Sequence, residues 1–321
     1  MEMLFQILIL AVGFVCLVKG SDWFVDGAEG IATKFGIPQI IIGLTIVAMG
    51  TSAPEAAVSI TAAINGNADI TIGNIVGSNI LNVLIILGLS ALVFPLTVEK
   101  STMKIDIPVT IFATILLFIL GIDGSISRID GIILSIVFVC YISFLIFSVK
   151  KSKNLSKELS PEEASQDEET SKKPKSIWLL LLSTVIGLAL VILGSRFVVK
   201  SATFIAEALG WSDRFIGLTI VALGTSLPEL FTSVTAAAKK NCDIAIGNII
   251  GSNLFNILFV VGLSSLIIPV PFVKDFLVDI LFSLASVVAL LLFCLPKKRL
   301  SRVCGAIFLI AYLVYFILWL V

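Results

Sequence analysis

Long apolar runs separated by short polar stretches extend along the whole chain. Each run is about 20 residues long, the length at which a helix crosses the hydrocarbon core of a bilayer. The pattern therefore predicts an all-α polytopic membrane protein with ten spanning helices. The predicted spans are 3–20 (or as far as about 33), 38–64, 70–93, 104–121, 130–149, 177–205, 213–238, 244–267, 275–295 and 303–321.

The composition favours the same class of protein. Of the 321 residues, 58% are hydrophobic and only 14% are charged. A soluble domain of this size could not bury that much apolar surface, whereas a bilayer accepts it. The first apolar run is long and begins beside the acidic Glu2, so we expect a spanning helix there rather than a cleaved signal peptide.

One polar segment, residues 150–176, interrupts the series after the fifth span. It combines six acidic residues with lysine clusters and has almost no large apolar side chain, so it cannot bury enough surface to fold alone. We expect three parts: a first five-helix repeat over 1–149, a linker over 150–176 and a second five-helix repeat over 177–321.

The basic residues predict the orientation of the chain. With the N-terminus outside, 17 of the 22 Lys and Arg residues lie in inside loops and 5 lie at outside ends. Cytoplasmic loops of membrane proteins carry an excess of Lys and Arg. We therefore expect a plasma-membrane protein with both termini outside and the 150–176 linker in the cytoplasm.

The two halves repeat each other at a constant offset of 174 residues. Residues 43–59 (GLTIVAMGTSAPEAAVS) match 217–233 (GLTIVALGTSLPELFTS) at 12 of 17 positions, and 69–88 match 243–262 at 12 of 20. Because each half has five spans, an odd number, the second half enters the membrane from the opposite side. Many secondary transporters are such inverted repeats, with a binding site near the midplane where helices of both halves are interrupted.

Glu55 and Glu229 occupy equivalent positions and are the only acidic residues that we place deep inside spans. An ionised carboxylate in lipid is costly, so each is expected to face a cavity and meet a cation. A structural glutamate bonded to a neighbouring helix is the alternative. Duplication at the same place in both halves favours the functional interpretation.

Hydroxyl and amide groups accompany both carboxylates. Thr51 and Glu55 are four residues apart, as are Ser78 and Asn82, so each pair lies on one helical face. The spacing recurs in the second half at Thr225 and Glu229, and at Ser252 and Asn256. For serine and threonine, close helix packing or a bond back to the helix is the alternative, above all for Ser52, Ser59, Ser226 and Ser233.

Pro54 and Pro228 are expected to open their helices, because proline lacks an N–H and its ring displaces the carbonyl four residues earlier. Irregular backbone at membrane depth is tolerated beside a cavity. We therefore expect backbone carbonyls to turn towards a cation, namely those of Ala48, Gly50, Thr51, Ala222, Gly224 and Thr225.

All of these ligands are oxygens, the set that hard cations such as Ca²⁺ prefer. The chain has no histidine, and none of its five cysteines lies in a CxxC pair. Histidine metal sites, a disulfide framework and Ser-His-Asp catalysis are therefore not indicated. Two glutamates balance the charge of one Ca²⁺ or two Na⁺.

The GTSxPE motifs at 50–55 and 224–229, each followed by a GSN segment, resemble the two α-repeats of the sodium/calcium exchanger branch of the calcium/cation antiporter superfamily. These α-repeats would cover about 38–93 and 213–267, and the resemblance extends over nearly the whole chain. It implies exchange of Na⁺ for Ca²⁺ by alternating access, with spans 1 and 6 sliding across the others. The implied ion ligands are Glu55, Glu229, Thr51, Thr225, Ser52, Ser226, Ser78, Ser252, Asn82 and Asn256, with backbone from Ala48 and Ala222.

The resemblance also bears on the coupling ion. Potassium-dependent relatives carry an aspartate where this chain has Asn256, which implies no requirement for K⁺. Proton/calcium exchangers usually have a motif closer to GNxxE, so a proton-coupled antiporter with the same site is the nearest alternative. A cation channel and an intramembrane protease are less favoured. No enzyme activity, cofactor, nucleic acid or obligatory protein partner is indicated, and the short linker leaves no room for large calcium-sensing domains.

Overall fold

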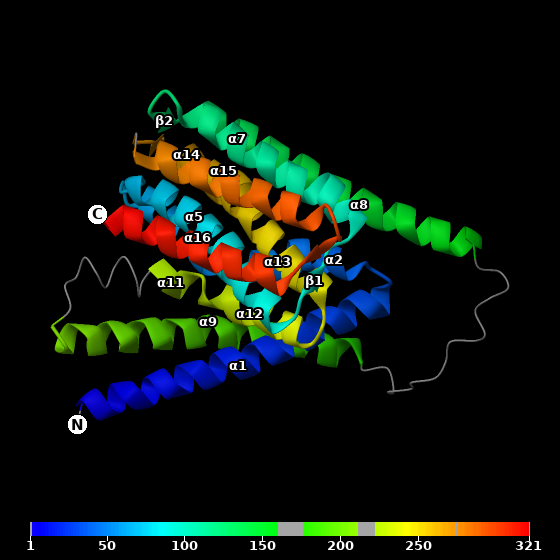
Figure 1. Ribbon diagram of the computed structural model, residues 1–321, viewed down its shortest axis with the longest axis horizontal. Helices are drawn as coiled ribbons and strands as arrows, with labels where there is room; N and C mark the ends of the chain where they lie inside the picture. The colour runs from blue at the N-terminus through cyan, green and yellow to red at the C-terminus, as the bar shows by residue number, and fades with distance from the viewer. Residues whose placement is uncertain (1, 160–175, 211–221, 274, 321) are drawn as a thin grey trace.

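The computed structural model describes residues 2–159, 176–210, 222–273 and 275–320, which form a bundle of long helices (Figure 1). In the first half, the elements, in which η marks a π-helix, are α1 (Glu2–Phe35), α2 (Gln39–Ile42), η1 (Gly43–Val47), α3 (Ala48–Thr51), α4 (Ala53–Ile64), α5 (Asp69–Leu81), η2 (Asn82–Ile86), α6 (Leu87–Val93), β1 (Leu96–Thr97), η3 (Thr102–Asp106), α7 (Ile107–Gly121), β2 (Ser125–Ile126) and α8 (Arg128–Leu159). In the second half they are α9 (Ile177–Ala208), α11 (Ala222–Thr225), α12 (Leu227–Ala238), α13 (Cys242–Leu254), η5 (Phe255–Val261), α14 (Gly262–Ile267), β3 (Val270–Pro271), α15 (Asp275–Cys294), β4 (Arg299–Leu300) and α16 (Arg302–Leu320).

The all-helical polytopic fold is confirmed. Among the described residues, seven helices are long and apolar enough to cross a membrane, and the bent pair Gln39–Thr51 and Ala53–Ile64 makes an eighth span. The C-terminal helix, α16, is a shorter apolar helix. The first part of the predicted span 213–238 lies outside the described residues.

Two boundaries differ from the prediction. α1 runs without a break from Glu2 to Phe35, so the longer version of the first span is correct. α8 continues to Leu159, beyond the predicted span 130–149, although its membrane-crossing part, Arg128–Val149, agrees with that span. The added residues are mostly Lys, Leu, Glu and Ser, and the first three favour helix even where no apolar face has to be buried. The rest of the predicted linker, 160–175, lies outside the described residues.

Two short antiparallel sheets show the internal symmetry directly. β1 pairs with β4, and β2 pairs with β3. Adding the offset of 174 to β1 gives β3, and adding it to β2 gives β4, so the two sheets are one pairing made twice. Figure 1 shows the sheets at opposite ends of the bundle, as an inverted repeat requires.

The turns follow the same symmetry. Six residues in the described ranges have positive φ, and they form three pairs at the 174 offset: Gly36 with Gly210, Gly66 with Lys240, and Gly124 with Lys298. Left-handed backbone is strained for a residue with a side chain. Lys240 and Lys298 therefore mark two turns whose shape the second half keeps without glycine.

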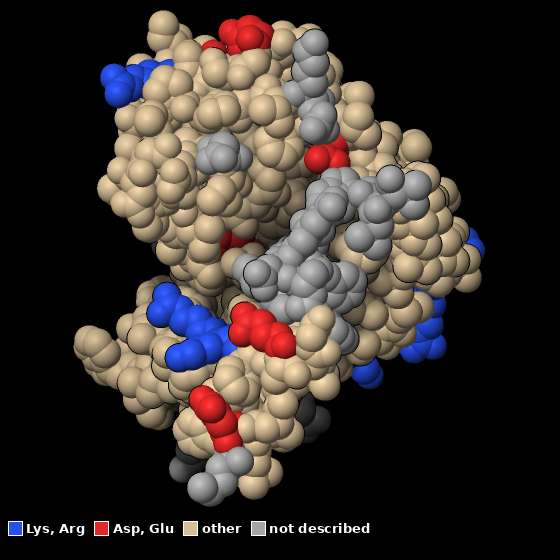
Figure 2. Space-filling view, turned by 90° about the vertical axis from the view of Figure 1, so that its left-hand side faces the viewer, with Lys and Arg blue, Asp and Glu red and all other residues tan. Residues whose placement is uncertain are grey.

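α1 and α9 form a pair along one side of the molecule (Figure 1). A Cβ atom added to Gly13 would lie 3.0 Å from the carbonyl oxygen of Gly194, and one added to Gly20 would lie 2.9 Å from that of Gly187. Small residues allow membrane helices to approach this closely. Gly13 faces Gly194 and the later Gly20 faces the earlier Gly187, so α1 and α9 are antiparallel. Seen from the end at which the N-terminus lies, a hollow partly separates this pair from the rest (Figure 2).

One group of ion pairs connects α1 to the end of α12. Lys239 Nζ lies 3.2 Å from Asp22 Oδ1 and 2.7 Å from Asp26 Oδ1. At the equivalent positions of the other half, α9 carries Arg196 and Lys200, and Asn65 replaces the lysine. The charges on the long helix are thus reversed, and the ion pairs have no counterpart with the same chemistry.

Carboxyl–tyrosine bonds occur in both halves, one of them buried and the other half-buried. The Tyr141 hydroxyl donates to Asp106 Oδ1 at 3.0 Å, and the Tyr315 hydroxyl donates to Asp279 Oδ1 at 2.8 Å. Asp106 is buried at the start of the span Thr102–Gly121. Asp106 lies near the end of its span and not deep inside it, and it turns inward because a tyrosine on the neighbouring helix bonds it.

Candidate cation-binding site

A helix break positions each of the two glutamates. Ser52, at φ −81° and ψ 6°, separates α3 from α4, and the helix axes on its two sides differ by 50°. Ser226 has the same conformation between α11 and α12. Pro54 and Pro228 lie in the first turn that follows, where a missing N–H costs no helical bond. Glu55 and Glu229 therefore stand at helix N-termini, which favour negative charge.

The helix breaks at Ser52 and not at Gly50, and one of the carbonyls that we expected to be freed keeps its helical hydrogen bond. The Ala48 carbonyl still accepts the Ser52 N–H at 3.0 Å, so the prediction that this carbonyl leaves its helical bond is wrong. It also accepts the Ser252 hydroxyl of the other half at 3.4 Å. Ala222 begins α11 in the corresponding helix.

Each carboxylate is bonded by a serine of the opposite half. Both glutamates are fully buried. Ser52 Oγ donates to Glu229 Oε1 at 2.7 Å, and Ser226 Oγ donates to Glu55 Oε1 at 3.3 Å. Ser78 Oγ lies 3.4 Å from Glu55 Oε1 and 3.1 Å from Ser226 Oγ. These contacts bring both helix breaks and α5 together at one point.

The amide nitrogens of Asn82 and Asn256 donate hydrogen bonds to other asparagines. Asn82 Nδ2 donates to Asn253 Oδ1 at 2.9 Å, and Asn256 Nδ2 donates to Asn79 Oδ1 at 3.1 Å. Their side-chain oxygens accept no hydrogen bond. Both residues lie in π-helical turns, η2 and η5, a backbone form that is frequent at functional sites.

Four buried oxygens in this region have no hydrogen-bond donor. They are Oε2 of Glu55 and Glu229 and Oδ1 of Asn82 and Asn256. Throughout the described ranges, these are the only buried carboxylate and amide oxygens without a partner. An acceptor buried without a donor destabilises a fold, and a bound cation removes that cost. Four oxygens from both halves are a ligand set for a hard cation.

The threonines are less symmetric than the glutamates. Thr51 is fully buried, and its hydroxyl donates to Asn248 Oδ1 at 2.9 Å rather than to a carboxylate. Thr225 is only half-buried. Both stand one turn before their glutamates, as their spacing predicts.

Four asparagines that support the site were not predicted from the sequence. Asn74 Nδ2 donates to Ser59 Oγ at 2.9 Å and to the Glu55 carbonyl at 3.3 Å. Asn248 makes the same two bonds, to Ser233 Oγ at 2.8 Å and to the Glu229 carbonyl at 3.4 Å. Ser59 and Ser233 are therefore engaged in helix–helix bonds, as the alternative interpretation of these serines expects. Asn79 and Asn253 complete the set. All four are identical across the repeat, which was the available signal.

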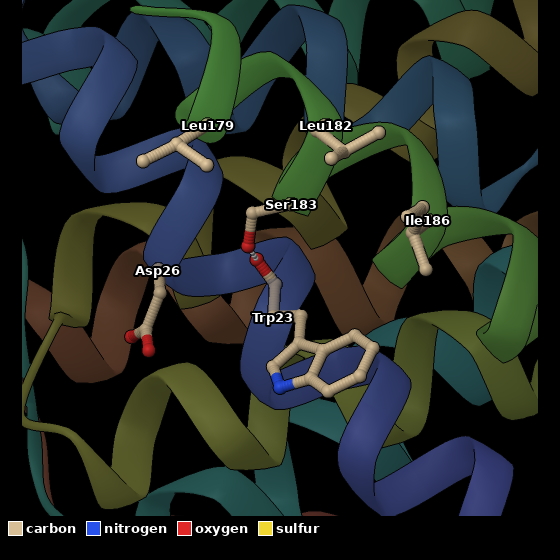
Figure 3. Close-up of a pocket in the computed structure, with 6 residues that line it drawn as sticks. All are labelled: Trp23, Asp26, Leu179, Leu182, Ser183 and Ile186. Carbon is tan, nitrogen blue, oxygen red and sulfur yellow. Dashed lines mark hydrogen bonds between the residues drawn. The ribbon is translucent and has the colours of Figure 1, made fainter. Parts of the chain in front are cut away.

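A separate groove lies on the α1–α9 pair (Figure 3). Trp23 and Asp26 of α1 and Leu179, Leu182, Ser183 and Ile186 of α9 line it. The Ser183 hydroxyl donates to the Trp23 carbonyl at 2.8 Å, and Trp23 and both leucines are exposed. This groove shares no residue with the central cluster.

A buried set of hard oxygen ligands where two inverted halves meet defines a secondary transporter for cations. The chain belongs to the sodium/calcium exchanger protein family, whose model matches residues 5–147 and 179–321. The family consists of transporters rather than enzymes, and the protein is an integral membrane protein.

Individual relatives are similar over most of their length. The sodium/calcium exchanger MaX1 of Methanosarcina acetivorans is 36% identical over 298 residues, which are 82% of this chain and 83% of MaX1. The inner membrane protein YrbG of Escherichia coli is 38% identical over 269 residues, 83% of this chain and 81% of YrbG. A solved structure of the sodium-calcium exchanger NCX_Mj, soaked with Na⁺ and Sr²⁺, has a TM-score of 0.83 at 34% identity and covers 98% of each chain.

Proposed function

We propose that the protein exchanges Na⁺ for Ca²⁺ across the membrane, independently of K⁺, through the site between its two halves. One observation carries the proposal: among the described residues, the buried carboxylate and amide oxygens without a hydrogen-bond donor are two of each kind, contributed equally by both repeats. Oxygens of this kind, without sulfur or imidazole, suit Ca²⁺ and Na⁺.

The charge of the site favours competition between the two ions. Two buried glutamates are neutralised by one Ca²⁺ or by two Na⁺, and an uncompensated charge in this environment would be costly. The NCX_Mj structure, soaked with Na⁺ and Sr²⁺, supports the same pair of ion types, because Sr²⁺ is also a hard divalent cation. Asn256 adds no third negative charge, which favours independence from K⁺.

The remaining predicted ligands surround this centre. We assign Glu55, Glu229, Asn82 and Asn256 to the central cation. The flanking positions for Na⁺ would use the hydroxyls of Ser52, Ser226, Ser78, Ser252, Thr51 and Thr225 and the backbone of Ala48 and Ala222. The bonds between serines and glutamates are consistent with this division, since a hydroxyl that donates to a carboxylate still has lone pairs for a small cation.

Transport would follow alternating access, with the α1–α9 pair sliding across the other helices. The paired glycines allow α1 and α9 to pack closely against each other along their length, so that they can move as one unit. The organisation into repeats 1–149 and 177–321 around the 150–176 linker belongs to this proposal. So do a plasma-membrane location, which is supported by the similarity to the inner membrane protein YrbG, and an orientation with both termini outside.

The test is Ca²⁺ uptake into Na⁺-loaded proteoliposomes diluted into Na⁺-free medium, with matched vesicles that carry a proton or K⁺ gradient instead. Uptake that follows only the Na⁺ gradient supports the proposal. Uptake driven by protons and indifferent to Na⁺ identifies a proton/calcium antiporter with the same site. Uptake that needs no counter-ion indicates a channel.

A further inference from the structure

Four asparagines form a closed, two-fold pattern between α5–η2 and α13–η5. Asn79 Nδ2 donates to the Asn253 carbonyl at 3.3 Å, and Asn253 Nδ2 donates to the Asn79 carbonyl at 3.4 Å. Their side-chain oxygens accept the amide groups of Asn256 and Asn82. All four residues are buried.

These bonds determine which way each amide faces. Because Asn253 Nδ2 is held by a carbonyl, Asn253 Oδ1 must face Asn82, and only the Asn82 nitrogen can meet it. If Asn82 were rotated by half a turn, two amide oxygens would face each other without a proton between them. The same argument fixes Asn256 through Asn79. In both cases the oxygen is left without a donor, on the side where a cation needs it.

We propose that Asn79 and Asn253 are positioning residues, each of which holds the cation ligand of the opposite half with its amide oxygen towards the ion. This inference rests on the proposed function only in that Asn82 and Asn256 bind the transported cation. Neither positioning residue contacts the ion. Each acts by preventing an amide nitrogen, which repels cations, from turning into the site.

The crossed pattern gives each ligand a partner from the other repeat. Asn82 belongs to the first half and is held by Asn253 of the second, whereas Asn256 is held by Asn79 of the first. Removing a residue that orients a metal ligand without touching the ion typically changes the affinity by about 10–100-fold. We therefore expect a change in cation affinity rather than in the amount of folded protein.

The test is equilibrium binding of Ca²⁺ to the purified full-length protein in detergent without Na⁺. Asn253→Leu and Asn79→Leu keep the branching of the side chain at its γ atom but remove the amide, and each should weaken Ca²⁺ binding at least about tenfold. Asn67→Leu, at an exposed asparagine outside the site, is the matched control and should leave the affinity unchanged. Thermal unfolding and gel filtration show whether each variant is folded, and Asn253→Ser replaces Asn253→Leu if the leucine variant is not.

A double-mutant cycle separates orientation from general packing. If Asn253 acts through Asn82, then Asn253→Leu should add less than about a twofold loss in an Asn82→Ala background, and should keep its loss of about tenfold in an Asn256→Ala background. Equal losses in both backgrounds, or no loss in the single variants, would overturn the inference.

The proposed function fails in a different way. A wild-type protein that binds Ca²⁺ but transports it with protons refutes Na⁺ coupling and leaves the positioning role intact. A wild-type protein that binds no divalent cation refutes both.

Discussion

The two repeats make equivalent contacts at the centre of the molecule but carry different charges on the long helices α1 and α9. Around the glutamates, the bond from Ser52 to Glu229 has a counterpart from Ser226 to Glu55, and each asparagine bond of one half recurs in the other. In the C-terminal half of α1, by contrast, Asp22 and Asp26 bind Lys239, whereas the equivalent positions of α9 are Arg196 and Lys200.

This difference separates two physical requirements. A site that presents the same ligands in two mirrored states needs equivalent contacts from both halves. The relative stability of those states has no such requirement, because an ion pair made in only one of them shifts the equilibrium by its own free energy. The symmetric centre should therefore determine which ion is bound, and the asymmetric charges of α1 and α9 should influence the preferred conformation.

The largest expected effect comes from breaking the symmetric centre. Glu55→Gln and Glu229→Gln should each lower Ca²⁺ exchange by at least about 100-fold, because a neutral amide leaves the divalent charge uncompensated in a buried site. Initial rates of Ca²⁺ uptake into proteoliposomes measure this. Glu99→Gln, at an exposed acid outside the cluster, should keep the wild-type rate. Full exchange by either central variant would exclude the site.

The second prediction asks whether the symmetry extends to the carboxyl–tyrosine bonds. Tyr141→Phe should destabilise the protein by about 1–3 kcal/mol, because the buried carboxyl group of Asp106 loses a donor, and Tyr315→Phe should destabilise it by less, because Asp279 is only half-buried. Thermal unfolding in detergent measures the effect, with Tyr312→Phe as a control on a tyrosine next to the second bond. A loss from only one of the two variants would show that the two halves differ here as well.

The third prediction concerns these asymmetric charges. Lys239→Gln should change the apparent Ca²⁺ affinities at the two membrane faces in opposite directions, by up to about fivefold, since partly exposed ion pairs contribute roughly 0–1 kcal/mol. Uptake by right-side-out and inside-out vesicles measures both faces. Lys240→Gln removes the same charge one residue away and is the control. Equal changes at both faces would indicate that these ion pairs do not bias the conformation.

The last prediction concerns the turns. Lys240→Gly should stabilise the protein by about 1 kcal/mol, because glycine removes the strain of a left-handed residue. Lys298→Gly should act in the same direction. It should also relieve the repulsion by which Lys100 lowers the pKa of Lys298. Gly66→Ala, at the turn equivalent to Lys240, should destabilise, and a stable Gly66→Ala protein would contradict the explanation.

Much of this fold could be predicted from the apolar runs and from the internal repeat. The offset of 174 residues, which the sequence shows between 43–88 and 217–262, also relates β1 to β3, β2 to β4 and the turns that contain a residue with positive φ. Strands of two residues have no sequence pattern of their own. The continuation of α8 to Leu159 was not predicted, since hydropathy marks where a span ends and not where a helix ends.

The site was predictable to the level of its charged ligands. Glu55 and Glu229 stand out because a carboxylate in a span is costly. The roles of Asn79 and Asn253 depend on which helix faces which, and the spacing within one helix does not contain that information. The position of the helix break was also predicted inexactly, since it lies at Ser52 and not at Gly50. The Ala48 carbonyl keeps its bond to the Ser52 N–H and also accepts the Ser252 hydroxyl of the other half, a contact that the sequence does not reveal.

The most direct test of a single site shared by both halves is the stoichiometry of Ca²⁺ binding, measured by equilibrium dialysis on the purified wild-type, Glu55→Gln and Glu229→Gln proteins. A shared central site predicts one Ca²⁺ per chain in the wild type and none at comparable affinity in either variant. Retention of a Ca²⁺ site with wild-type affinity in one of the variants would contradict it, because each half would then bind its own ion.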